Sequence, residues 1–236
     1  MRIGLVTEEL SFGSGSGGIG GAFHELALAL TRSGYETDLI FLPADLALPK
    51  DALLAYYADR GIRVVIPDLD RHVWGPLSYE KRSYALFRHF AELETGYYGA
   101  IHFHDYKGLA YFSLTAKAQR LAFAQTSLVV QAHGPTRWAL EANGHPFTHE
   151  DQLKIDFMER ESIARADVLV SPSHYMLQWL KEHGWGTPPK DRVHVIQNVC
   201  SHIQSLVGTQ ATTDEGSRRF NEIVFFGRHE GRKGIV

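Results

Sequence analysis

Two stretches near opposite ends of the sequence carry residues that could hold an anionic group. The first is a glycine-serine run, Gly13–Gly21, which follows an apolar stretch and precedes a helical pattern. Glycines let the backbone approach a ligand closely, and a helix N-terminus offers unpaired N–H groups and a partial positive charge. The second is a loop with Arg228, Arg232 and Lys233 after the apolar run at 223–226. If both stretches meet one ligand, the predicted chemistry is capture of a diphosphate between glycines and cations.

The glycine run has two alternative interpretations. It could be a dinucleotide site, but the run is too long for the tight G-x-G-x-x-G turn, and no carboxylate stands cleanly at the end of the strand predicted at 37–42. It could also be a flexible surface loop without a ligand. The position between a predicted strand and a predicted helix favours anion binding over both.

Three histidines stand where predicted strands end. His102 and His104 are two residues apart at the strand predicted at 100–103, so they share one face, and Asp105 follows them. These residues could hold a metal ion, but a strand-end pair with Asp105 capping the next helix is favoured. His133 follows a later strand, and by itself it is better interpreted as a buried histidine that is hydrogen-bonded to the backbone.

Other polar and aromatic residues are interpreted as structural. Glu159 and Glu161 are expected on a solvated helix face and not as a catalytic pair. Ser171 and Ser173 are expected to cap a helix around Pro172, since the sequence has no G-x-S-x-G elbow. Tryptophans expected in the core or at its rim are Trp138, Trp179 and Trp185, and the one expected in a loop is Trp74.

Strand and helix patterns alternate along most of the chain. The predicted strands cover residues 2–7, 37–42, 62–66, 100–103, 127–131, 168–170 and 192–196. The predicted helices cover residues 22–33, 51–60, 78–96, 107–119, 153–165 and 174–183. Strands that alternate with helices predict an α/β fold with a doubly wound, parallel, Rossmann-like sheet.

Composition excludes several classes of protein. The chain has 236 residues, 44% of them hydrophobic, so it can bury a substantial core. A net charge of −3 gives no basic field that would favour a nucleic-acid partner. The single cysteine, Cys200, excludes an internal disulfide framework and indicates a cytoplasmic protein. No apolar run reaches the ~20 residues that span a bilayer, although Lys81, Arg82 and Arg88 on one predicted helix leave peripheral membrane attachment open.

The domain organisation predicted from the sequence has three parts. Residues 1–200 form the Rossmann-like domain, and the polar stretch at 201–220 is a linker. Residues 221–236 are the first strand and loop of a second, truncated domain, because the apolar run needs neighbouring strands on both sides.

Six sequence elements together resemble a known family. The run Gly17-Gly-Ile-Gly-Gly-Ala-Phe-His-Glu-Leu-Ala-Leu-Ala-Leu30 resembles the opening of retaining GT-B glycosyltransferases of family 4, and more distantly of glycogen and starch synthases. Further elements follow in the family's order: Ile101-His-Phe-His-Asp105, Val129-Val-Gln-Ala-His-Gly134, Glu159–Ser173, Val193-His-Val-Ile-Gln-Asn198 and Phe225-Phe-Gly-Arg-His-Glu-Gly-Arg-Lys-Gly234. The resemblance implies a GT-B N-terminal domain on the acceptor side of the cleft, followed by the start of the nucleotide-sugar-binding domain.

The resemblance also implies roles for individual residues. The backbone at Gly17 and Gly18 would meet the donor diphosphate, and His133 would contact the donor sugar through its ring or its backbone carbonyl. Arg228 and Lys233 would bind the diphosphate and neutralise it as it leaves. The catalytic residues implied are therefore His133, Arg228 and Lys233, with no metal and no cofactor.

Acceptor-side contacts are implied for His104 and Asp105. The partners would be an NDP-sugar donor and a sugar, polysaccharide or lipid-linked acceptor, at the inner membrane face if the enzyme attaches there. Two departures from the family pattern stand out: the glycine run has no lysine, and the Asn198-Val-Cys200 ending lacks the usual glycine.

The function implied is transfer of a sugar from an NDP-sugar to an acceptor hydroxyl with retention, and the chain alone is expected to be inactive. Two alternatives stay open at this point. One is a non-catalytic α/β module that binds a phosphate-bearing ligand. The other is a GT-B-like epimerase that acts on a nucleotide sugar.

Overall fold

The computed structural model describes residues 1–12, 17–43 and 49–199. The described strands form one sheet in the order β3-β2-β1-β4-β5-β6-β7, and every strand pairing is parallel. The strands are β1 (Arg2–Thr7), β2 (Glu36–Phe41), β3 (Ile62–Val65), β4 (Ala100–His104), β5 (Ser127–Gln131), β6 (Val168–Ser171) and β7 (Val193–Val195). The predicted α/β, doubly wound, Rossmann-like fold is confirmed.

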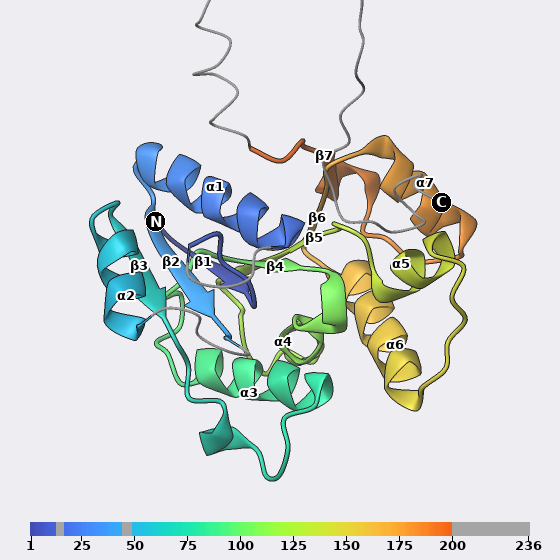
Figure 1. Cartoon of the computed structure of the whole chain (residues 1–236), viewed down its shortest axis with the longest axis horizontal. Helices are drawn as coiled ribbons and strands as arrows, with labels where there is room; N and C mark the ends of the chain where they lie inside the picture. Colours follow the sequence, from blue (N-terminus) through green and yellow to red (C-terminus); the bar gives the residue numbers. More distant parts are fainter. Residues whose placement is uncertain (13–16, 44–48, 200–236) are drawn as a thin grey trace, which may run out of the picture.

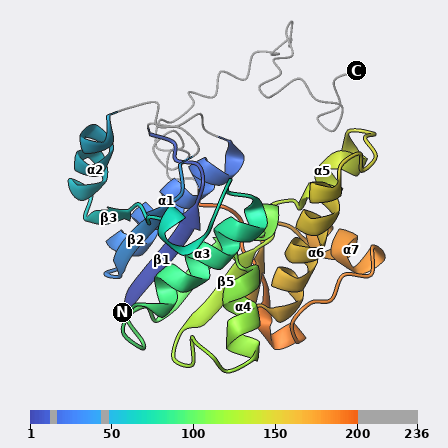
Figure 2. The ribbon, with the colours of Figure 1, turned by 90° about the horizontal axis from the view of Figure 1, so that it is seen from below.

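Helices cover both faces of this sheet (Figure 1). The α-helices are α1 (Gly18–Arg32), α2 (Lys50–Ala58), α3 (Tyr79–Ala91), α4 (Tyr111–Ala118), α5 (Thr136–Ala142), α6 (Glu150–Arg165) and α7 (His174–Glu182). Three short 3-10 helices are η1 (Asp70–His72), η2 (Tyr106–Gly108) and η3 (Lys190–Arg192). Helix α1 lies on one side of the sheet, and α3, α4 and α6 pack against one another on the other side (Figure 2).

Two buried clusters hold the layers together. On the α1 side, Leu5 of β1 belongs to the same fully buried cluster as Phe23 of α1. On the opposite side, Val6 of β1 joins a larger cluster with Leu86 of α3 and Leu114 of α4. Successive residues of a strand point to opposite faces, so a strand buried on both faces must be apolar at nearly every position.

Most predicted elements are present, and the differences have local causes. The helix predicted at 107–119 is interrupted near its start, because Lys107 has a left-handed backbone (φ 68°). Residues 106–108 form the short helix η2, and α4 begins only at Tyr111. Helix α5 was not predicted, because its seven residues are too few to show a helical repeat. The proposed linker (201–220) and second-domain strand (221–236) lie outside the described residues and stay predictions.

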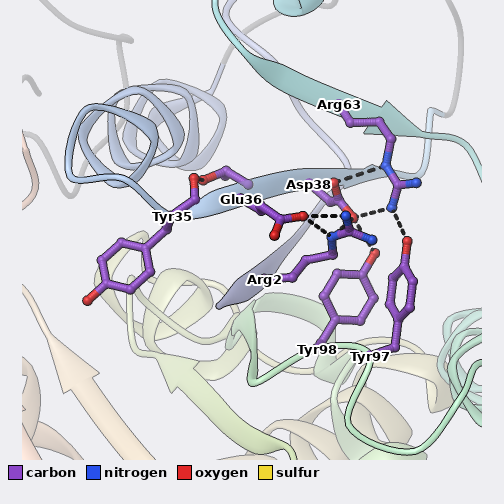
Figure 3. Close-up of polar contacts among 8 residues, drawn as sticks. Arg2, Tyr35, Glu36, Asp38, Arg63, Tyr97 and Tyr98 are labelled. Atoms are coloured by element: carbon purple, nitrogen blue, oxygen red, sulfur yellow. Dashed lines mark hydrogen bonds and ion pairs between the residues drawn. The ribbon is translucent and has the colours of Figure 1, made fainter.

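An ion cluster ties the amino-terminal ends of four strands together (Figure 3). Asp38 of β2, whose side chain is 4% exposed, accepts from Arg63 Nε at 3.0 Å and from the Tyr98 hydroxyl at 2.8 Å. Arg2 of β1 pairs with Glu36 and lies over the Tyr97 ring. The cluster therefore fixes the edge of the sheet that lies opposite the carboxyl ends of the strands.

The strand order reverses between β1 and β4. The chain builds β1, β2 and β3 toward one edge and then returns, so that β4 pairs with the other side of β1. At such a switch point the chain connections from the two neighbouring strands run in opposite directions, which opens a crevice at the carboxyl ends of the strands. Ligands of open α/β sheets bind in this crevice. The ends of β1 and β4 are therefore where a site is expected.

Candidate functional site

The carboxyl ends of β4 and β5 bring three predicted site residues together. His104 ends β4 and pairs with Gln131 of β5, and the Asp105 N–H donates to the Gln131 carbonyl at 2.9 Å. His133 follows β5 by two residues. His104, Asp105 and His133 were proposed from separate stretches of sequence, and the sheet register places them side by side.

Asp105 holds the backbone that carries His133. Its buried carboxylate accepts from the His133 N–H at 2.9 Å and from the Gly134 N–H at 3.1 Å. Burial raises the pKa of Asp105 to about 6, although these two amides work to lower it. The prediction that the Asp105 side chain caps the next helix is wrong: the residue stands at the N-cap position of η2, but its carboxylate serves the loop after β5.

Three imidazoles gather around the Phe23 ring of α1. The ring centroids of His102, His104 and His133 lie 5.5, 5.8 and 5.9 Å from that of Phe23. One ring nitrogen on each is buried and has no partner among the described residues: His102 Nε2, His104 Nδ1 and His133 Nε2. Burial lowers the pKa of His102 and His104 to about 4 and that of His133 to about 3, so all three are neutral at pH 7.

The arrangement of these histidines does not form a metal site within the described residues. No group of three or more His, Cys, Asp or Glu side chains is placed there to hold a metal ion. Neutral imidazoles with a free nitrogen can donate a hydrogen bond to a ligand oxygen or accept one from a hydroxyl. The three imidazoles are therefore confined to neutral hydrogen bonding at pH 7.

Glu159 of α6 accepts backbone N–H groups from η2 and α5, a structural role that the sequence interpretation missed. It was expected on a solvated helix face, but it is fully buried. Its carboxylate accepts from the Lys107 N–H at 2.7 Å, the Thr136 N–H at 2.9 Å and the Thr136 hydroxyl at 2.7 Å. Burial raises the pKa of Glu159 well above its ordinary value, and the nearby Asp105 adds to the shift. The expectation holds for Glu161, which is part-exposed and pairs with Arg165 one turn on.

A helical repeat could have found Glu159. The buried residues of α6 include Ile155, Met158, Ser162 and Ile163, and Glu159 lies on the same stripe, one turn after Ile155. A carboxylate on a buried stripe needs hydrogen-bond donors, because its burial is otherwise costly. Glu161 lies off that stripe.

Helix α1 begins at the predicted glycines. Gly17 is its N-cap, and its N–H donates to Glu9 Oε2 at 3.0 Å, so one N–H of this helix end is already satisfied within the chain. Nothing lies within 4 Å of where a Cβ on Gly18 would stand, so that position is open. Arg228 and Lys233 lie outside the described residues, and their place relative to the helix stays a prediction.

A second charged group lies at the carboxyl end of β1. Glu8 pairs with Arg82 of α3 at 2.8 Å and with Lys107 of η2 at 3.2 Å. The positive charge of Lys107 is one of the causes that lower the pKa of His104, although burial is the larger one. The Glu8, Arg82 and Lys107 group and the histidines are therefore neighbours along the carboxyl edge of the sheet.

The sequence profile of the glycosyl transferase 4-like domain matches residues 17–199, which include the histidines, Asp105 and Glu159. The chain belongs to the glycosyl transferase 4-like family. Comparison with curated protein sequences finds no significant match. The resemblance to family 4 glycosyltransferases is therefore confirmed at the level of the family.

One of the solved structures similar to this glycosyl transferase 4-like domain supports the same fold. Sucrose-phosphate synthase from Thermosynechococcus elongatus matches with a TM-score of 0.57 at 15% identity, over 83% of this chain and 47% of that one. The catalytic domain of starch synthase IV from Arabidopsis thaliana, bound to ADP and acarbose, matches with a TM-score of 0.44 at 12% identity, over 84% of this chain and 51% of that one. The chain thus spans about half the length of these two structures.

The remaining predictions concern residues outside this group. Ser173 caps α7 by accepting from the Met176 N–H at 3.3 Å, as predicted. Trp179 and Trp185 lie in the core, and Trp138 packs at its rim. Trp74 is 93% exposed in its loop. Among the described helices, none has both the length and the apolar character that crossing a membrane requires.

Proposed function

We propose that this glycosyl transferase 4-like domain forms the acceptor-side wall of an enzyme that transfers a sugar, with retention, from an NDP-sugar to an acceptor hydroxyl. The observation that carries the proposal is the neutral His133, fixed by Asp105 next to His104 at the carboxyl edge of the sheet. A neutral, rigid imidazole suits hydrogen bonding to a sugar hydroxyl.

His133 acts by positioning and not by proton abstraction. With a pKa of about 3, its imidazole is too weak a base to deprotonate an acceptor hydroxyl efficiently at neutral pH. The departing diphosphate is the base that this proposal assigns, and Gly17, Gly18, Arg228 and Lys233 would stabilise its growing charge. No covalent enzyme nucleophile and no metal are then needed.

The test uses the full natural polypeptide with UDP-, GDP- and ADP-sugars and a panel of sugar acceptors. Product anomers are assigned by NMR, and retention is expected. His133→Ala should lower kcat/KM by about a hundredfold, because it removes a contact that positions the sugar. Lys233→Ala should lower it by about a thousandfold, because the charge of the departing diphosphate grows in the transition state. His145→Ala is the matched control, because His145 is exposed on the loop after α5 and should leave kcat/KM unchanged.

The isolated chain of residues 1–236 should transfer no sugar and bind nucleotide-sugar weakly. Turnover by this chain alone would refute that expectation. A tight complex between this chain and a phosphate-bearing ligand, with no transfer by the full polypeptide, would instead favour the non-catalytic module. Conversion of the donor sugar without any acceptor would favour the epimerase.

A further inference from the structure

Two cations converge on one carboxylate at the carboxyl end of β1. Arg82 Nη1 lies 2.8 Å from Glu8 Oε1, and Lys107 Nζ lies 3.2 Å from Glu8 Oε2. The side chain of Arg82 is 19% exposed, that of Lys107 22% and that of Glu8 11%. All three can therefore be reached from solvent but are largely shielded from it. The cluster has one positive charge in excess.

Lys107 is held in this place against its own backbone preference. Its φ is 68°, a left-handed conformation that is uncommon for a residue with a side chain, and the Glu159 carboxylate accepts its N–H at 2.7 Å. Its ammonium lies 4.4 Å from the centroid of the Tyr79 ring and 5.1 Å from that of Tyr106. Strain of this kind persists only where surrounding contacts enforce it, and such residues concentrate at ligand sites.

The cluster stands at the β1/β4 switch point. Glu8 directly follows β1, and Lys107 follows β4 by three residues. Arg82 enters from α3, on the face opposite α1. Lys107 is close enough to His104 to affect the pKa of that imidazole.

We propose that Arg82 and Lys107 bind the phosphate monoester of a small phosphorylated sugar, with Glu8 as an internal carboxylate that the phosphate displaces. A guanidinium fork and a point-charge ammonium together suit a compact dianion. A two-cation site, part-buried in a chain of net charge −3, fits a small ligand and not a polyanion. The sugar would extend toward the neutral histidines. Its role as acceptor rests on the proposed function, but its binding does not.

Because the phosphate must displace Glu8, three substitutions should change its affinity in opposite directions. This sign pattern distinguishes a binding site from a structural cluster. Arg82→Met and Lys107→Met each remove a charge-assisted contact, so each should weaken binding about tenfold. Glu8→Gln removes the competing charge and leaves both cations, so it should strengthen binding several-fold. A cluster with a purely structural role would alter stability in all three variants without this opposite effect on affinity.

The experiment titrates glucose 1-phosphate and glucose 6-phosphate into the 236-residue chain at constant ionic strength, followed by amide NMR shifts. Glucose and inorganic phosphate are titrated in parallel. The expected result is that at least one sugar phosphate binds more tightly than either control, with the sign pattern above. Lys154→Met is the matched control, since Lys154 is a surface lysine paired with Glu150 on α6.

Each of the other outcomes overturns the proposal. Equal binding of inorganic phosphate and both sugar phosphates excludes recognition of the sugar. Absence of binding, or binding that Arg82→Met does not weaken, excludes the site. If Lys107→Met does not fold by circular dichroism, Arg82→Met and Glu8→Gln still decide the sign pattern. Sugar transfer is not read out, so failure here is distinct from failure of the proposed glycosyltransferase activity.

Discussion

At the residue scale, Glu159 and Asp105 have the same structural role, because each binds the backbone of a loop. Both are buried carboxylates, and both accept backbone N–H groups from loops that carry candidate ligand contacts, Lys107 for one and His133 for the other. Neither needs to touch a substrate. They are positioning residues, because they set the backbone from which the contacting side chains project.

Glu159→Ala should lower the free energy of unfolding by about 3 kcal/mol, because three buried donors lose their acceptor. Urea unfolding of the 236-residue chain measures this loss. Glu161→Ala is the matched control two residues away, and it should change stability by less than about 1 kcal/mol, since its pair with Arg165 is a part-exposed i,i+4 contact. Equal losses in the two variants would contradict the assigned role of Glu159.

At the scale of elements, η2 packs directly against α6. A Cβ on Gly108 would come within 2.5 Å of Met158 Cβ and 2.9 Å of the Met158 carbonyl carbon. These are rigid atoms of α6, so they cannot move aside as the end of a long side chain could. The close approach brings Glu159 within reach of the Lys107 N–H, and glycine is what permits it.

Gly108→Ala should therefore destabilise the chain by about 3 kcal/mol or more, measured as the shift of the urea midpoint. Gly144→Ala separates the steric clash from backbone strain. Gly144 has a similar left-handed φ of 69°, against 65° for Gly108, but nothing lies within 4 Å of its Cβ position. Gly144→Ala should therefore lower the free energy of unfolding by only about 1 kcal/mol. A loss at Gly108 no larger than that at Gly144 would show that α6 and η2 do not pack as described.

At the scale of the whole molecule, the buried histidines should set its stability toward acid. Each is neutral when folded, with a pKa near 4 or 3, and has an ordinary value of 6.5 when unfolded. The unfolded chain therefore binds more protons below pH 6.5, so stability is full above that pH and falls as the pH drops toward 4. Asp105 acts in the opposite direction, because its raised pKa of about 6 favours the folded state as the pH falls.

Buried Glu159, whose pKa is also raised by burial, acts in the same direction as Asp105. The three histidines outnumber these two carboxylates, so the free energy of unfolding should decline from pH 6.5 to pH 4.5. Urea titrations at half-unit steps measure the slope. His133→Asn should flatten it by up to one proton, or about 1.4 kcal/mol per pH unit, while His145→Asn, on the exposed loop, should leave it unchanged. An unchanged slope in His133→Asn would mean that this imidazole is not buried and neutral.

The sequence by itself determined the order of elements and the fold class. Apolar strands that alternate with amphipathic helices permit little except a parallel, doubly wound sheet. Strand ends were readable as well, which is why His104, Asp105 and His133 could be proposed before any geometry was known. These are local properties, since periodicity and turn residues act within one element.

Only the tertiary structure decided which partners the buried polar groups have. The Asp105 carboxylate serves the loop after β5, the Glu159 carboxylate holds the backbone of Lys107, and Glu8 gathers cations from α3 and η2. Each contact joins residues that are 28 to 99 positions apart. A helical pattern gives the face of α6 but not the loop packed against it, because that loop is brought there by sheet register and chain crossover.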